Sequence, residues 1–212
     1  MERVTEAFIW PFRDPDCISK LLIIALTLLI PIVGSINGLG WMLASLDNLR
    51  AGRDRLAPAN LSYLGRGFRL FAVEVIYAIG IALVAIVIFV PAIALASQQG
   101  KGSANGALIA LAVFLNLLAF SVVTVLSLAL YFVTPAIVLA TDRGGISGGI
   151  QVGAVIRRCR VNLAHTLIAG LMLIAASFVG SLGSILCGVG VLVTTAYALA
   201  MQAWIVHSFE KG

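Results

Sequence analysis

Three long stretches of this chain are almost free of charge. The stretch Phe71–Ala96 has one carboxylate, Ala107–Thr141 has no charged side chain, and Leu163–Ser208 has only two histidines. About 20 consecutive apolar residues are enough to cross the hydrocarbon core of a bilayer as a helix. The pattern therefore predicts a polytopic membrane protein.

Composition supports the same class. Hydrophobic residues make up 61% of the chain, charged residues 11%, and the mean hydropathy is +1.08, whereas soluble domains are about 45–50% apolar. No polar stretch is long enough to form a separate soluble domain. We therefore expect residues 1–212 to form a single membrane-embedded domain.

The N-terminal segment, residues 1–17, has a different character. Aromatic residues such as Trp10 and Phe12 lie beside Arg13, a combination typical of the headgroup boundary. We expect this segment to be interfacial. Asp14 followed by Pro15 predicts a helix start, with the aspartate as N-cap and the proline as the first helical residue.

The first apolar region, residues 18–46, contains several helix breakers. Pro31, Gly34, Asn37, Gly38 and Gly40 all fall inside it. So many breakers argue against a single straight helix. The region is expected to be either one kinked helix or two short helices in a hairpin broken near Pro31–Gly40.

Four more apolar segments are predicted, at 70–96, 107–140, 165–182 and 186–207. The second would be about 50 Å long as a helix, so we expect it to tilt, to kink at Pro135 or to project into the interface. The predicted fold class is therefore all-α, a helical membrane bundle of five to six apolar segments.

Residues 145–162 predict an amphipathic interfacial helix. Its apolar residues recur at helical spacing, at Val152, Val155, Ile156, Cys159 and Leu163. Its arginines fall off that stripe, where they can meet lipid headgroups: Arg157, Arg158 and Arg160.

The distribution of positive charge predicts the orientation. The 48–69 loop has five Lys or Arg residues and the 142–162 segment has four, whereas the 97–106 loop has one and the 183–190 turn has none. The positive-inside rule places the first two in the cytoplasm. We expect a multi-pass protein of the cell's inner or plasma membrane with both termini in the cytoplasm. Five spans with the N-terminus outside is the alternative.

Short motifs resemble those of a known family. Phe12-Arg-Asp-Pro-Asp16, Lys20, Leu29-Ile-Pro-Ile-Val-Gly34, Gly40-Trp41 and Gly65-Arg-Gly67 are similar to the opening of a prokaryotic multi-pass membrane family known only as a domain of unknown function. The resemblance implies a small helical membrane protein. It implies no activity and no catalytic residues.

An intramembrane polar site is one hypothesis for function. Glu74 lies about one turn into a predicted span, and Asn116 and Thr124 lie in the next long segment. A carboxylate inside a membrane is a functional hypothesis by default. Glu74 either carries a proton or cation, or pairs with an arginine such as Arg66 or Arg69. Asn116 and Thr124 suit helix packing as well as a polar pathway.

A basic surface is the other hypothesis. It would contact anionic lipid or a partner protein through Arg66, Arg69, Arg157, Arg158 and Arg160. His165 and His207 fall near predicted cytoplasmic helix ends, where an interfacial polar tip is a more common role than ligation.

No catalytic motif, metal-ligand spacing or cofactor signature is found in the sequence. We therefore expect a non-enzymatic protein without catalytic, cofactor-binding or metal residues. The leading hypothesis is an accessory or structural subunit that packs against partner helices and anionic lipid, with membrane lipids, other membrane subunits or a second copy as partners and no nucleic acid. The alternative is a small solute or ion transporter that uses Glu74.

Overall fold

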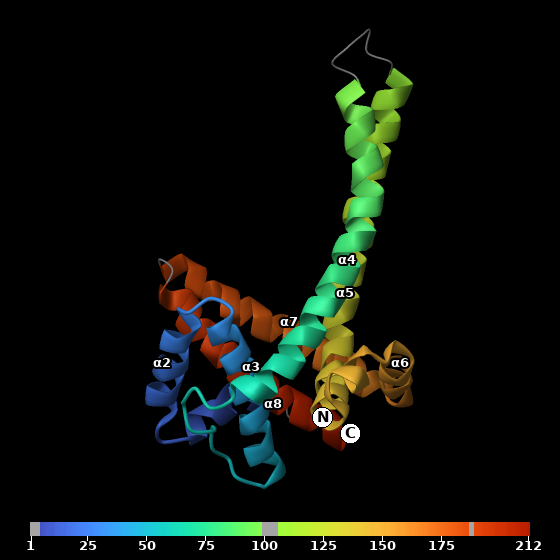
Figure 1. Cartoon of the computed structure of the whole chain (residues 1–212). Coiled ribbons are helices and arrows are strands. Elements are labelled where there is room, and N and C mark those ends of the chain that lie inside the picture. Colours follow the sequence, from blue (N-terminus) through green and yellow to red (C-terminus); the bar gives the residue numbers. More distant parts are fainter. Residues whose placement is uncertain (1–4, 99–105, 187–188) are drawn as a thin grey trace. The chain divides into compact units, whose positions relative to one another are not determined.

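The computed structural model describes residues 5–98, 106–186 and 189–212, and these residues are almost wholly helical (Figure 1). The all-α prediction is confirmed. The elements are α1 (Glu6–Ile9), η1 (Trp10–Arg13), α2 (Cys17–Leu28), α3 (Val33–Arg50), α4 (Leu64–Gln98), α5 (Gly106–Ile150), α6 (Val152–Val161), α7 (Leu163–Leu182), η3 (Gly183–Leu186) and α8 (Val189–Lys211).

The chain divides into two compact units. The first, called here the core unit, combines residues 1–73 with 131–212, and the second, called the hairpin unit, comprises Glu74–Leu130. The helices α4 and α5 each run from one unit into the other. The division reflects where contacts within the chain are dense and does not define domains. That residues 1–212 form a single membrane-embedded domain therefore stays a prediction.

The first apolar region forms two helices rather than one kinked helix. The break lies at residues 29–32, where Ile32 has a φ of 65°, and α3 packs back against α2. A Cβ on Gly34 would lie 2.1 Å from the Thr27 carbonyl oxygen, so only glycine allows this close approach. The other predicted breakers, Asn37, Gly38 and Gly40, lie inside α3.

The core unit is built around α8, which packs against α7, α3, α2, η1 and α1. The indole N–H of Trp10 donates to the Ala200 carbonyl (3.2 Å), and the Tyr197 hydroxyl donates to the Phe8 carbonyl (2.6 Å). Trp10 is fully buried. The Trp10 side chain thus anchors the N-terminal segment to α8, and the interfacial position of this segment stays a prediction.

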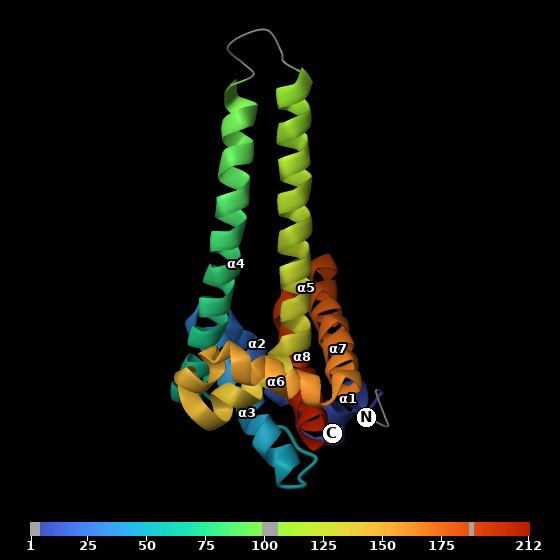
Figure 2. The same ribbon diagram turned by 90° about the vertical axis from the view of Figure 1, so that its right-hand side faces the viewer.

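In the hairpin unit, the described parts of α4 and α5 run alongside each other in opposite directions (Figures 1 and 2). Most of the predicted 97–106 loop lies outside the described residues. Apolar side chains dominate both helices, and many large ones are exposed, including Val87 (72%), Phe114 (61%) and Phe120 (68%).

Four of the described helices are long and apolar enough to cross a membrane, within Leu64–Leu95, Gly106–Ile150, Leu163–Leu182 and Gly190–Lys211. The predicted count of five to six spans is not confirmed. The helix α2 has only 12 residues, about 18 Å at 1.5 Å per residue. The helix α3 is longer but does not meet the same criterion, because polar residues and glycines interrupt its apolar sequence.

The region around residue 145 contains two interruptions of the helical backbone. The helix α5 continues through Pro135 and has its non-helical residue at Gly145 (φ 64°, ψ −157°). The predicted amphipathic helix over 145–162 is not continuous, because Gln151 separates α5 from the shorter α6. On α6, Val155 and Cys159 are buried, whereas Val152 and Ile156 are largely exposed.

Candidate functional site

A polar stripe on α3 holds the loop of residues 51–63. Asn37, Trp41, Ser45 and Asn48 are spaced for one helical face and bond to the loop backbone. The bonds run from Asn37 Nδ2 to the Asn60 carbonyl (2.9 Å), from Trp41 Nε1 to the Ala57 carbonyl (3.0 Å), from the Ala57 N–H to Ser45 Oγ (3.1 Å) and from Asn48 Nδ2 to the Arg55 carbonyl (3.0 Å). The Gly40-Trp41 pair is thus part of a loop anchor.

Asp14 also bonds to this loop. Its carboxylate accepts from Lys20 Nζ (2.7 Å), the Leu56 N–H (2.8 Å) and the Asp16 N–H (3.0 Å). Burial alone would raise the pKa of Asp14, but the Lys20 ammonium and the two N–H groups outweigh it and lower that pKa. The predicted N-cap role is wrong: α2 begins at Cys17, and Asp14 ties α2 to the loop.

A network of six charged residues joins α3, α4, α5 and α8 within the core unit. It contains three acids and three arginines, so their charges balance: Asp47, Arg50, Arg66, Asp142, Arg143 and Glu210. Arg50 bridges three carboxylates, those of Asp142 (2.7 Å), Glu210 (2.8 Å) and Asp47 (3.0 Å). The Asp142 side chain is 8% exposed, so its charge depends on these partners.

The electrostatics of α3 follow from this network. Burial by itself would raise the pKa of Asp47. The guanidinium groups of Arg66 and Arg50 lower it by more than this, so the pKa lies below its usual value. Burial lowers the pKa of Arg50, and the carboxylates of Glu210 and Asp142 more than reverse this, so Arg50 remains charged. The network therefore acts as a charge-balanced link between helix ends.

The five arginines predicted to contact lipid or a partner have different environments. Arg66 belongs to the charge network, and it also lines a cavity of about 230 Å³ with Arg69, Leu43, Thr141 and Asp142. On α6, Arg157 and Arg160 are exposed. Arg158 is partly buried, and that burial, together with nearby Arg143, lowers its pKa. Of these five arginines, Arg66 alone forms an ion pair within the part of the chain that the structure describes.

The predicted polar site of Glu74, Asn116 and Thr124 is not joined by contacts. Within residues 5–98, 106–186 and 189–212, no hydrogen bond or ion pair links Glu74 to Asn116, to Thr124 or to an arginine. Asn116 Nδ2 instead donates to the Ala112 carbonyl of its own helix (2.9 Å). Arg66, one predicted partner of Glu74, is taken by Asp47 and Asp142.

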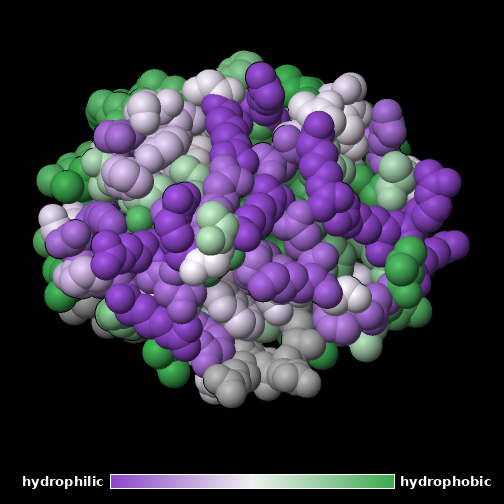
Figure 3. All heavy atoms as spheres, turned by 90° about the horizontal axis from the view of Figure 1, so that it is seen from below, coloured by the Kyte–Doolittle hydropathy of each residue, from purple (hydrophilic) through white to green (hydrophobic). Residues whose placement is uncertain are grey.

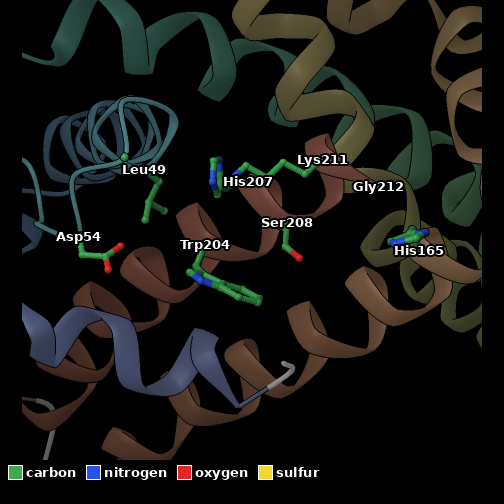
Figure 4. Close-up of a pocket in the computed structure, with 9 residues that line it drawn as sticks. Leu49, Asp54, His165, Trp204, His207, Ser208, Lys211 and Gly212 are labelled. Atoms are coloured by element: carbon green, nitrogen blue, oxygen red, sulfur yellow. The ribbon is translucent and has the colours of Figure 1, made fainter. Parts of the chain in front are cut away.

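Hydrophilic residues gather on one face of the molecule (Figure 3). A cavity of about 600 Å³ in the core unit is lined by Leu49, Gly52, Asp54, His165, Trp204, His207, Ser208, Lys211 and Gly212. Figure 4 shows the α8 side chains between Leu49 and Asp54 on one side and His165 on the other. The two predicted interfacial histidines therefore line the same cavity, although 42 positions separate them in the sequence.

The other lining residues of this cavity, called here the α8 cavity, were not predicted. Trp204, His207, Ser208 and Lys211 follow i, i+3, i+4, i+7 spacing, so a polar stripe at the end of an apolar segment was a usable signal. Asp54 had no such signal, because only the folded 51–63 loop brings it here. No group of three or more His, Cys, Asp or Glu residues suitable for a metal occurs among the described residues.

The family model described as "Protein of unknown function (DUF4013)" matches residues 23–189. The chain belongs to this family. The predicted resemblance to an uncharacterised family is confirmed, and the DUF4013 match includes the Gly40-Trp41 and Gly65–Gly67 motifs but begins after Asp14 and Lys20. No curated protein and no solved structure matches the chain. The four apolar helices and this family together indicate a membrane protein of unknown function.

Proposed function

We propose that this protein is a non-enzymatic accessory subunit of a membrane assembly. Its core unit would form a self-contained anchor, and its hairpin unit would pack against helices of a partner. Anionic lipid would meet the exposed arginines of α6. The protein would work in the cell's inner or plasma membrane, with its basic loops and both termini on the cytoplasmic side.

The observation that carries this proposal is the low burial of the hairpin helices. In the most apolar 18-residue windows of α4 and α5, 6% and 11% of residues are buried by the chain itself. The exposed groups are large and apolar, so water cannot cover them, and either lipid or other helices must. Two long helices with so few internal contacts are suited to contacting another protein.

Site-specific photo-cross-linking tests this role. A photoreactive residue at Phe120, in the hairpin unit and 68% exposed, should give an adduct with one other polypeptide in native membranes. A matched probe at Phe178, on α7 of the core unit and 65% exposed, should give mainly lipid adducts. The cross-linked polypeptide should also co-purify in stoichiometric amount in mild detergent. Lipid adducts alone at both positions would contradict the proposal.

A small proton- or ion-coupled transporter is the second candidate. One observation favours it: Glu74 has no ion-pair partner among the described residues, although Arg66 and Arg69 precede it on the same helix. A carboxylate without a fixed counter-ion is free to bind a proton or a cation.

Glu74→Gln separates the two candidates. In proteoliposomes, a coupled transporter should lose ion-driven uptake with this substitution and keep part of it with Glu74→Asp, which retains the carboxylate. An accessory subunit should assemble with its partner normally in both variants. Absence of any uptake by the wild-type protein would end the transport hypothesis.

A further inference from the structure

We propose that the α8 cavity of the core unit is a binding site for a phosphate group, carried either by a membrane lipid or by a soluble compound. This inference goes beyond the accessory role, since neither partner packing nor transport through Glu74 needs this cavity. It combines three observations: a buried histidine with an unpartnered nitrogen, cationic side chains that form no ion pair among the described residues, and a suitable size.

The first observation concerns α8. Trp204, His207, Ser208 and Lys211 present four polar groups to the same cavity from neighbouring turns of one helix (Figure 4). His207 is only 9% exposed, and its Nδ1 has no hydrogen-bond partner. A buried polar atom without a partner costs about 1–3 kcal/mol, so its persistence beside a cavity indicates a group that a ligand can satisfy.

The second observation concerns charge. The carboxylate of Asp54 pairs with Arg13 (3.0 Å), whereas Lys211 forms no ion pair within residues 5–98, 106–186 and 189–212. A second cavity of about 180 Å³ shares His165 and Gly212 with the first and adds Arg158 and Glu210. Glu210 is bound by Arg50 and Arg143, so the charged side chains of the two cavities that form no ion pair among the described residues are Lys211 and Arg158.

The third observation concerns size and chemistry. A volume of about 600 Å³ lies within the range of about 300–1,000 Å³ for small-molecule sites. Lysine ammonium, imidazole and hydroxyl groups are all donors to phosphate oxygens. The indole of Trp204 and the side chain of Leu49 offer apolar surface for whatever carries the phosphate. The cavity thus fits a phosphate attached to a small organic group.

Ligand titration of the full-length protein in an uncharged detergent tests this site. The probes are inorganic phosphate, short-chain phosphatidic acid, and the corresponding diacylglycerol, which lacks phosphate. Calorimetry gives affinity, and tryptophan fluorescence reports location, since Trp10 and Trp41 are fully buried and Trp204 lines the cavity. We expect a phosphate-bearing probe to bind and change the emission, and the diacylglycerol to do neither.

Substitutions at the cavity complete the test. Lys211→Gln should weaken binding about tenfold, equivalent to the loss of one charge-assisted bond. Arg55→Gln, which removes the same charge from an exposed position of the 51–63 loop that lines neither cavity, should change it less than twofold. His207→Gln, checked for native thermal unfolding, should also weaken binding.

The outcomes separate the two sources of phosphate. Binding of phosphatidic acid alone would identify a lipid headgroup as the occupant, and equal binding of inorganic phosphate would identify a soluble compound. Failure of both phosphate probes, or unchanged affinity in Lys211→Gln, would overturn the proposal. Neither result depends on the cross-linking experiment, so the site and the accessory role can fail separately.

Discussion

The helices of the hairpin unit are more apolar than those at the centre of the core unit, and the chain itself buries less of them. In their most apolar windows, α4 and α5 have 6% and 11% of residues buried, against 39% for α7 and 44% for α8. Small residues account for part of the difference, because α8 places Ala196, Ala200 and Ala203 at positions that are fully buried. The two most apolar helices are therefore the ones that the chain leaves for lipid or a partner, and the two less apolar helices are the ones that it packs itself.

The polar groups of the two units differ in the same way. In the hairpin unit, Asn116 and Ser121 donate to carbonyls four residues earlier in their own helix (2.9 and 2.8 Å). In the core unit, Asp14, Asn37 and Trp41 bond to residues of another element. A helix whose polar groups are satisfied internally can face lipid at little cost, whereas cross-element bonds fix one tertiary arrangement.

The largest effect is expected from the loop anchor of the core unit. Asp14→Ala leaves the Lys20 ammonium and the Leu56 N–H without their carboxylate. The free energy of unfolding in detergent should therefore fall by about 3–5 kcal/mol. Asp16→Ala, an exposed neighbour, is the control and should cost less than about 0.5 kcal/mol. Thermal or denaturant unfolding measures both. Equal effects of the two substitutions would refute the anchor.

This anchor also predicts a pH dependence. The folded pKa of Asp14 is lowered, so its stabilising contribution is present above the pKa of the unfolded state. The contribution is lost as pH falls through the lower, folded pKa. The wild-type protein should lose stability over that acidic range, and Asp14→Asn should be less stable at neutral pH with a flatter acidic slope. If the stability of Asp14→Asn depended on acidic pH as steeply as that of the wild-type protein, other carboxylates would be responsible for the acid sensitivity.

An intermediate effect is expected from glycines of one helix that runs through both units. A Cβ on Gly67, in the core unit, would lie 1.8 Å from the Ile36 carbonyl oxygen, whereas nothing lies within 4 Å of one on Gly80, in the hairpin unit. Gly67→Ala should destabilise the protein by about 1–3 kcal/mol through overpacking. Gly80→Ala should stabilise it by up to about 1 kcal/mol, because alanine favours a helix more than glycine does. Unfolding midpoints measure the difference between the two variants. If the hairpin helices were packed as tightly as the core, both substitutions would destabilise the protein.

The smallest effect is expected on the hairpin surface. Phe120→Ala removes a side chain that is 68% exposed, so the stability of the isolated protein should change by less than about 0.5 kcal/mol. The amount of a cross-linked partner should nevertheless fall, because Phe120 would lie in that interface. A loss of stability in the isolated protein would show instead that the chain itself packs this surface.

Several features could be predicted from the sequence for a clear physical reason. Uncharged runs of membrane length determine apolar helices locally, so the segments 70–96, 107–140, 165–182 and 186–207 correspond to α4, α5, α7 and α8. The breakers of the first apolar region likewise predicted a division, although only Pro31 and Gly34 lie near it. The roles of individual arginines were less predictable, since a pattern does not show that Arg66 faces Asp47 and Asp142.

By itself, then, the sequence determined that this chain is helical and suited to a membrane, because helix formation and apolar surface depend on neighbouring residues. Only the tertiary structure decided that Asp14 bonds to a loop 42 positions away and that His165 and His207 line the same cavity. It also decided which apolar helices are packed and which are left exposed. These properties depend on contacts between residues far apart in the chain, and no local periodicity encodes such contacts.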